Sequence, residues 1–118
     1  MTWEISFHEE FLSEFYDLTE TVQDELLAHT KLLESEGSLL KRPHADTLKG
    51  SQYKNMKELR FYADDGVWRI AFAFDPQQKA ILLVAGNKAG TSEKRFYKEL
   101  IAKADRRYDS HLQGLKSN

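Results

Sequence analysis

The stretch MKELRFYADDGVWRIAFAFDPQQKAILLVAG, from Met56 to Gly86, decides the fold. It contains three runs rich in apolar and aromatic residues, and the short sequences ADDG and DPQQ, which have the composition of turns, separate them. The runs predict three strands, at residues 54–61, 67–74 and 80–86. Because the connections are short, we expect the three strands to form an antiparallel meander.

The middle strand has two different faces. Large apolar side chains alternate with small or basic ones, and the second set consists of Arg69, Ala71 and Ala73. If Tyr62 pairs with Val67 across the first turn, Arg60 lies directly opposite Arg69. Like charges in that position destabilise a sheet by about 0.2–1 kcal/mol. Two neighbouring arginines therefore favour an anionic partner on this face.

The same reasoning across the second turn pairs Phe74 with Lys79 and Arg69 with Val84. It also places Lys88 at the end of the arginine face, after a stretch without acidic residues from residue 76 to 92. We expect a phosphate-binding trough here, because the small residues Ala71, Ala73 and Gly86 leave space above the sheet. The third strand adds Leu82 and Val84 to this face. The alternative is separate ion pairs, with Arg60 on Glu58 or Asp64 and Arg69 on a carboxylate from a helix.

The flanking segments predict a strand and three helices. Residues 3–7 alternate as a strand, Ser6 and Glu9 have the spacing of a capping box for the first helix, and residues 21–36 form a second helix that ends at Gly37. The inward positions of the second helix are Val22, Leu26, His29 and Leu33. Residues 39–51 are predicted as a loop, and a last helix begins near Glu93. We expect one α+β domain over residues 1–118, with an N-terminal helical hairpin packed on a small, mostly antiparallel sheet.

The charge is unevenly distributed along the chain. Residues 1–40 hold ten carboxylates and one lysine, a formal charge of −9, whereas residues 41–118 carry +7. This asymmetry favours a polyanionic partner such as nucleic acid. The chain has no cysteine, its four histidines are scattered, and no apolar run reaches the ~18 residues of a membrane span. We expect a soluble cytoplasmic protein with no disulfide, metal site, cofactor or membrane partner.

Four motifs carry a resemblance to a known family. They are MKELRF at 56–61, WRIAFAFD at 68–75, ILLVAGNKAG at 81–90 and RFY at 95–97. In this order and spacing the chain resembles the HigB-like toxins of the RelE/ParE superfamily over nearly its whole length. The resemblance implies a β-α-α-β-β-β-α fold, which agrees with the elements predicted above.

The resemblance also implies a function and a set of site residues. It implies a type II toxin that cuts messenger RNA in the ribosomal A site without a metal ion and is neutralised by a helix-turn-helix, HigA-like antitoxin. Arg60 and Arg69 then stabilise the pentacoordinate phosphate. Lys88 is a phosphate clamp or proton donor and Tyr97 an acid or base, with Glu58 as a less favoured base.

Further basic residues are assigned to RNA or ribosome binding: Lys49, Lys54, Lys57, Lys94 and Arg95. Two other functions stay open for the same fold. One is a ParE-like inhibitor of DNA gyrase, and the other is a binding module without catalytic activity.

Overall fold

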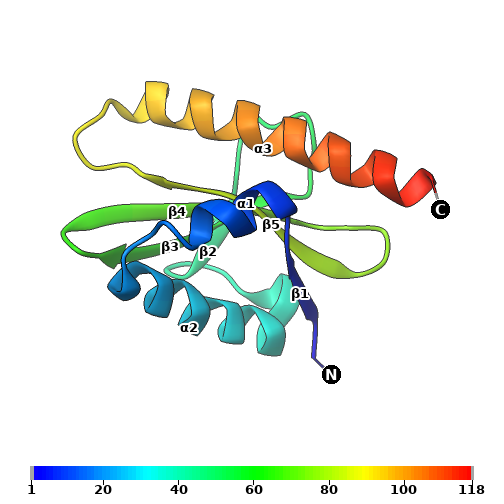
Figure 1. The fold of residues 1–118 in the computed structure, drawn as a ribbon, viewed down its shortest axis with the longest axis horizontal. Coiled ribbons are helices and arrows are strands. Elements are labelled where there is room, and N and C mark those ends of the chain that lie inside the picture. The colour runs from blue at the N-terminus through cyan, green and yellow to red at the C-terminus, as the bar shows by residue number, and fades with distance from the viewer. Residues whose placement is uncertain (1, 118) are drawn as a thin grey trace.

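Five strands form one sheet in the order β1-β5-β4-β3-β2 (Figure 1). The structure is a computed structural model that describes residues 2–117. The elements along the chain are β1 (Glu4–Phe7), α1 (Glu9–Phe15), α2 (Glu20–Glu36), η1 (Gly37–Leu39), β2 (Ala45–Thr47), β3 (Met56–Ala63), β4 (Gly66–Phe74), β5 (Lys79–Asn87) and α3 (Glu93–Lys116). The predicted β-α-α-β-β-β-α order is therefore confirmed. Two short elements, η1 and β2, are added where the sequence predicted a helix end and a loop.

The turn between β3 and β4 has the predicted register. Tyr62 pairs with Val67, and Arg60 pairs with Arg69. Asp64 and Asp65, the two central residues, have φ of 49° and 58°. This geometry suits a two-residue hairpin, because a turn with positive φ at both central positions follows the twist of the strands, and aspartate tolerates that backbone conformation.

The register between β4 and β5 differs from the prediction. Phe74 pairs with Ala80 rather than Lys79, and Arg69 pairs with Gly86 rather than Val84. Part of the difference arises at the loop, where the Asp75 carboxylate accepts hydrogen bonds from the amides of Gln77 and Lys79, both at 2.9 Å. The rest arises at an irregularity between Ala71 and Phe72. Leu82 consequently lies on the face opposite the arginines, opposite Phe72, whereas Val84 and Gly86 stay on the arginine side.

Helices cover both faces of the sheet, with α3 on one side and α2 on the other (Figure 1). The α2 side has a core of large side chains that includes Phe11, Leu26, Leu59 and Phe72. On the α3 side, Ala71 and Ala73 are completely buried against α3 residues such as Leu100 and Ala104. The predicted open trough above these alanines is therefore wrong. Small side chains at these positions give room to a helix rather than to a ligand.

Gly86 shows how close α3 approaches. A Cβ atom at this position would lie 2.8 Å from Cε1 of Phe96, on the first turns of α3. The absence of a side chain thus lets the helix sit directly on β5. As a result, α3 covers this face of the sheet from Gly86 to Ala73.

The N-terminal third also differs in detail. His8, not Ser6, caps α1, because its Nδ1 accepts a hydrogen bond from the amide of Glu10 at 3.2 Å. On α2, Thr30 takes the buried position predicted for His29, which is only half-buried. β1 pairs parallel with β5 and makes the sheet mixed. No helix within residues 2–117 combines the length and the apolar character that crossing a membrane requires.

Part of the acidic charge of the first third is used inside the fold. Arg107 of α3 is buried, and its two terminal nitrogens donate to the Glu14 carboxylate at 2.8 and 2.6 Å. A third bond runs from Arg107 Nη1 to the Leu83 carbonyl at 2.8 Å. Hydrogen bonding by Arg107 lowers the pKa of Glu14. The ion pair between Glu14 and Arg107 therefore holds α1 against α3.

Candidate active site

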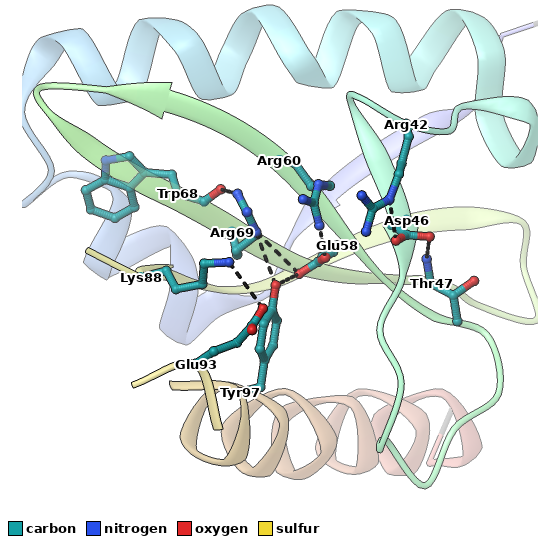
Figure 2. Close-up of polar contacts among 10 residues, drawn as sticks. All are labelled: Arg42, Asp46, Thr47, Glu58, Arg60, Trp68, Arg69, Lys88, Glu93 and Tyr97. Carbon is teal, nitrogen blue, oxygen red and sulfur yellow. Dashed lines mark hydrogen bonds and ion pairs between the residues drawn. The ribbon is translucent and has the colours of Figure 1, made fainter. Parts of the chain in front are cut away.

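Glu58 lies at the centre of a polar cluster on the arginine face, as Figure 2 shows. Its side chain is only 4% exposed. Arg60 Nη1 donates to Oε2 at 2.8 Å, and the Tyr97 hydroxyl donates to Oε1 at 2.9 Å. Arg69 Nε lies 3.9 Å from Oε1. One carboxylate therefore serves both arginines, which explains how a sheet can hold two guanidinium groups side by side.

The alternative of separate ion pairs is confirmed for Arg60 but not for Arg69. Arg60 does pair with Glu58, two positions earlier on the same strand face. The carboxylate near Arg69 comes from β3, however, and not from a helix.

Arg69 is fixed by its neighbours on β4 and α3. It is 3% exposed, and its Nε donates to the Tyr97 hydroxyl at 3.2 Å. Its Nη1 donates to the Trp68 carbonyl at 3.0 Å. These bonds hold the guanidinium plane in one orientation, and a rigid cation of this kind can bind an anion without first losing conformational freedom.

The Tyr97 hydroxyl joins the two halves of the cluster. It accepts from Arg69 and donates to Glu58. Burial is the largest cause that raises the pKa of Tyr97 above its ordinary value; the Arg69 hydrogen bond opposes the rise and Glu58 adds to it. A hydroxyl with a raised pKa stays protonated at neutral pH, so Tyr97 is suited to donate a proton rather than to abstract one.

Lys88 completes the group of predicted catalytic residues. Its Nζ lies 5.8 Å from the centroid of the Tyr97 ring and 3.3 Å from the Glu93 carboxylate. The stretch from residue 76 to 92 is free of acidic residues, but Glu93 folds back onto Lys88. Because the Glu93 side chain is largely exposed, this ion pair is worth little and can open for a competing anion.

Arg42 joins the site from the segment 39–51, which was predicted only as a loop. Its Nε donates to the Asp46 carboxylate at 2.9 Å, and this bond lowers the pKa of Asp46. Arg42 and Arg60 together border two cavities, of about 300 Å³ and about 620 Å³. The smaller cavity also contacts Tyr97 and Lys49. Nothing in the local sequence predicts this placement, because it depends on how the chain returns from α2 to β2.

Comparison with known proteins supports an assignment to a family. Residues 13–109 match the family described as “Phage derived protein Gp49-like (DUF891)”. The chain belongs to the Gp49-like family. Two relatives from Mycobacterium tuberculosis (strain ATCC 25618 / H37Rv) bear the names “Putative toxin HigB2” and “Putative toxin HigB3”. The first is 47% identical over 88 residues, and the second is 43% identical over 98 residues.

The coverage of these relatives differs. The alignment with HigB2 takes in 74% of this chain but 43% of that protein, so the chain spans less than half of its length. The alignment with HigB3 covers 83% of both proteins. The resemblance to HigB-like proteins found in the sequence is thereby confirmed.

Solved structures show the same fold. A mutant of the E. coli toxin RelE in the free state has a TM-score of 0.64 at 16% identity, covering 91% of this chain and 98% of that chain. An archaeal RelE–RelB complex from Pyrococcus horikoshii OT3 contains a chain with a TM-score of 0.55 at 17% identity, covering 77% of this chain and 100% of that chain. This HigB-like chain therefore has the RelE fold.

The five basic residues predicted for RNA or ribosome binding are dispersed in this HigB-like protein. Lys49 borders the smaller cavity, and Lys94 and Arg95 are exposed on the first turn of α3. Lys57 pairs with Phe72 and so points to the α2 side of the sheet, away from the arginines. Lys54 is exposed in the turn before β3. Of the five, Lys49 borders the same cavity as Arg60, and Lys57 lies on the opposite face of the sheet.

Proposed function

We propose that this HigB-like protein is the toxin of a type II toxin–antitoxin pair and a metal-independent endoribonuclease that cuts messenger RNA on the ribosome. The observation that carries the proposal is the cluster in which Arg60, Arg69 and Tyr97 converge on Glu58, with Lys88 beside the tyrosine ring. Two guanidiniums and one protonated hydroxyl can stabilise the charged phosphate and protonate the leaving oxygen when a neighbouring 2′-hydroxyl cleaves a phosphodiester.

In the proposed reaction the 2′-oxygen forms a bond to phosphorus and the bond from phosphorus to the 5′-oxygen breaks. The 2′-proton leaves to solvent, and Tyr97 gives its proton to the 5′-oxygen and regains one from solvent. The products are a 2′,3′-cyclic phosphate and a free 5′-hydroxyl. Arg60 and Arg69 stabilise the additional negative charge of the pentacoordinate state, a contribution often worth about 3 kcal/mol per well-placed donor.

Glu58 has a positioning role in this scheme. It holds the Tyr97 hydroxyl and the Arg60 guanidinium in place, and it partly neutralises the arginines while no substrate is bound. A substrate phosphate then competes with the carboxylate for Arg60. We infer that the ribosome supplies the remaining orientation of the RNA, because so few side chains select little sequence.

The partners follow from the same reasoning. One of the solved structures with this fold is a RelE–RelB complex. For this chain we propose a helix-turn-helix antitoxin that neutralises the toxin, and a cytoplasmic location where both ribosomes and antitoxin are found.

Growth and cleavage assays with Tyr97→Phe test the proposal. The substitution keeps the ring that packs against Phe96 and Lys88 and removes only the hydroxyl. We expect expression of the wild-type chain to arrest growth, and purified protein to cut ribosome-bound message about 100-fold or more faster than Tyr97→Phe. Tyr16→Phe, at an exposed tyrosine directly after α1, is the matched control and should cut like the wild type.

Two outcomes would reject the assignment. The first is degradation of free RNA with no cuts on ribosomes. The second is loss of DNA supercoiling by gyrase in the presence of the protein with messages left intact, which would favour the gyrase-inhibitor alternative.

A further inference from the structure

We propose that the larger cavity, of about 620 Å³, is a nucleotide subsite that holds a base of the RNA strand next to the scissile phosphate. The proposal rests on the proposed function and extends it to a part of the surface that the reaction itself does not use. The cavity lies between α2, residues 42–44 and the end of β3, and its border includes Glu25, His29, His44 and Tyr62.

The position of the cavity fits a strand that passes the arginines. Arg42 and Arg60 border both this cavity and the smaller one beside Tyr97. Arg69 also borders the larger cavity. A phosphate held by the arginines therefore has space for a nucleotide on each side. A volume of about 620 Å³ lies within the roughly 300–1,000 Å³ of small-molecule sites.

One wall of the cavity is aromatic. The His29 ring lies 5.4 Å from the His44 ring and 5.0 Å from the Phe61 ring, between centroids. Tyr62 adds a ring that is 76% exposed and so is available to a ligand. Flat rings beside cations are the combination by which proteins bind single-stranded nucleic acid, because every base has a face that can stack.

Charged residues of both signs border the cavity. Arg42 and Arg60 line it together with Glu25 of α2. On the same helix, His29 Nδ1 lies 2.9 Å from the Glu25 carbonyl oxygen, so in the neutral ring Nδ1 carries the hydrogen and Nε2 is the acceptor.

A nucleotide matches this polarity, because its phosphate is anionic and the edges of adenine, cytosine and guanine carry amino donors. An acidic peptide matches it less well, because its carboxylates would meet Glu25. The ligand class is therefore a nucleotide with an amino-bearing base.

Binding of short, uncleavable RNA to the full chain tests the subsite. The probe is a fluorescent adenosine trinucleotide whose 2′-oxygens are methylated, so that no 2′-hydroxyl is available for attack. A matched set lacks the base at each position in turn. We expect loss of the base at one position to weaken binding about tenfold, whereas loss at the others has a smaller effect.

His44→Ala separates stacking from phosphate binding. The substitution should weaken binding of the intact probe about tenfold and leave binding of the probe that lacks the critical base unchanged. Glu25→Gln should weaken the adenosine probe more than a uridine probe, because uracil has no amino group. Tyr16→Ala, at an exposed aromatic residue directly after α1, is the control and should bind all probes like the wild type. Circular dichroism of each variant establishes that the fold is retained.

Three results would overturn the subsite. One is equal affinity for intact and abasic probes. A second is an equal loss of affinity for the intact and the abasic probes in His44→Ala. The third is displacement of the probe by a hexaglutamate peptide from the wild type but not from His44→Ala, which would assign the cavity to an acidic protein segment. Ribosomal cleavage without any base effect would reject the subsite alone, and a base effect without cleavage would reject the proposed function alone.

Discussion

Replacing Glu58 with glutamine tests the polar cluster directly, because this carboxylate is the anion shared by Arg60 and Arg69. The substitution keeps the shape of the side chain and removes its charge. It leaves two guanidiniums next to each other, one of them only 3% exposed, with no negative partner. We expect Glu58→Gln to be folded but less stable than the wild type, and to recover stability when an anion is added.

The expected loss of unfolding free energy in Glu58→Gln follows from the surroundings of the carboxylate. Removing one partner of a fully buried ion pair costs about 3–5 kcal/mol. Three features reduce this cost here: the Arg60 side chain is 20% exposed and reaches water, Arg69 keeps its bonds to Tyr97 and to the Trp68 carbonyl, and the glutamine oxygen still accepts one bond. We therefore expect a loss of about 2 kcal/mol, or about 1 M in the midpoint of urea unfolding.

Urea unfolding with and without phosphate, at constant ionic strength, is the assay. Phosphate at ten times its dissociation constant adds about 1.4 kcal/mol to a folded state that binds it. Because phosphate also stabilises proteins in general, the quantity of interest is the difference between variant and wild type. Asp46→Asn, which breaks the exposed pair with Arg42, is the control and should lose less than about 0.5 kcal/mol. Equal midpoints for Glu58→Gln and wild type, with no gain specific to phosphate, would refute the shared-anion explanation.

The remaining predictions concern the packing of α3. Gly86→Ala places a methyl group 2.8 Å from Phe96 and should lower the unfolding free energy by about 1–3 kcal/mol in thermal melts, whereas Gly114→Ala meets no atom within 4 Å and should not. Arg107 lowers the pKa of Glu14, so this carboxylate contributes stability above its unfolded pKa, and the contribution is lost as pH falls through the lower folded value. The unfolding free energy should therefore fall less between pH 7 and pH 3 in Glu14→Gln than in the wild type. The same pH dependence in both proteins would contradict the role of this pair.

The order of elements and one register could be predicted from the sequence. The β3–β4 hairpin follows from a two-residue turn, which fixes the pairing of every residue in both strands once its ends are known, and so Arg60 opposite Arg69 was predictable. The start of α3 follows from the apolar spacing after Ser92, whose hydroxyl accepts a bond from the Arg95 amide. These features depend on short stretches of chain.

The predictions that proved wrong or incomplete concern features that depend on distant parts of the chain. The irregularity in the β4–β5 pairing, where Ala71 pairs with Val84 but Phe72 pairs with Leu82, has no signature in the residues around it. Small residues such as Ala73 leave room both for a ligand and for a helix, and only the packing of α3 decides between them. Arg42 reaches the site because of the path of the chain after α2, which no spacing rule describes. Glu58 was placed on the correct face, but its position between both arginines depends on Tyr97 and therefore on α3.

Mapping the ends of messages bound to ribosomes tests the central claim most directly. Purified wild-type protein is added to ribosome-bound messenger RNA, and the new ends are identified chemically. We expect cuts in the A site with 2′,3′-cyclic phosphate and 5′-hydroxyl ends, and few or none with Tyr97→Phe, while Tyr16→Phe cuts like the wild type. Equal cutting by the wild type and Tyr97→Phe, or ends that carry a 5′-phosphate, would contradict it.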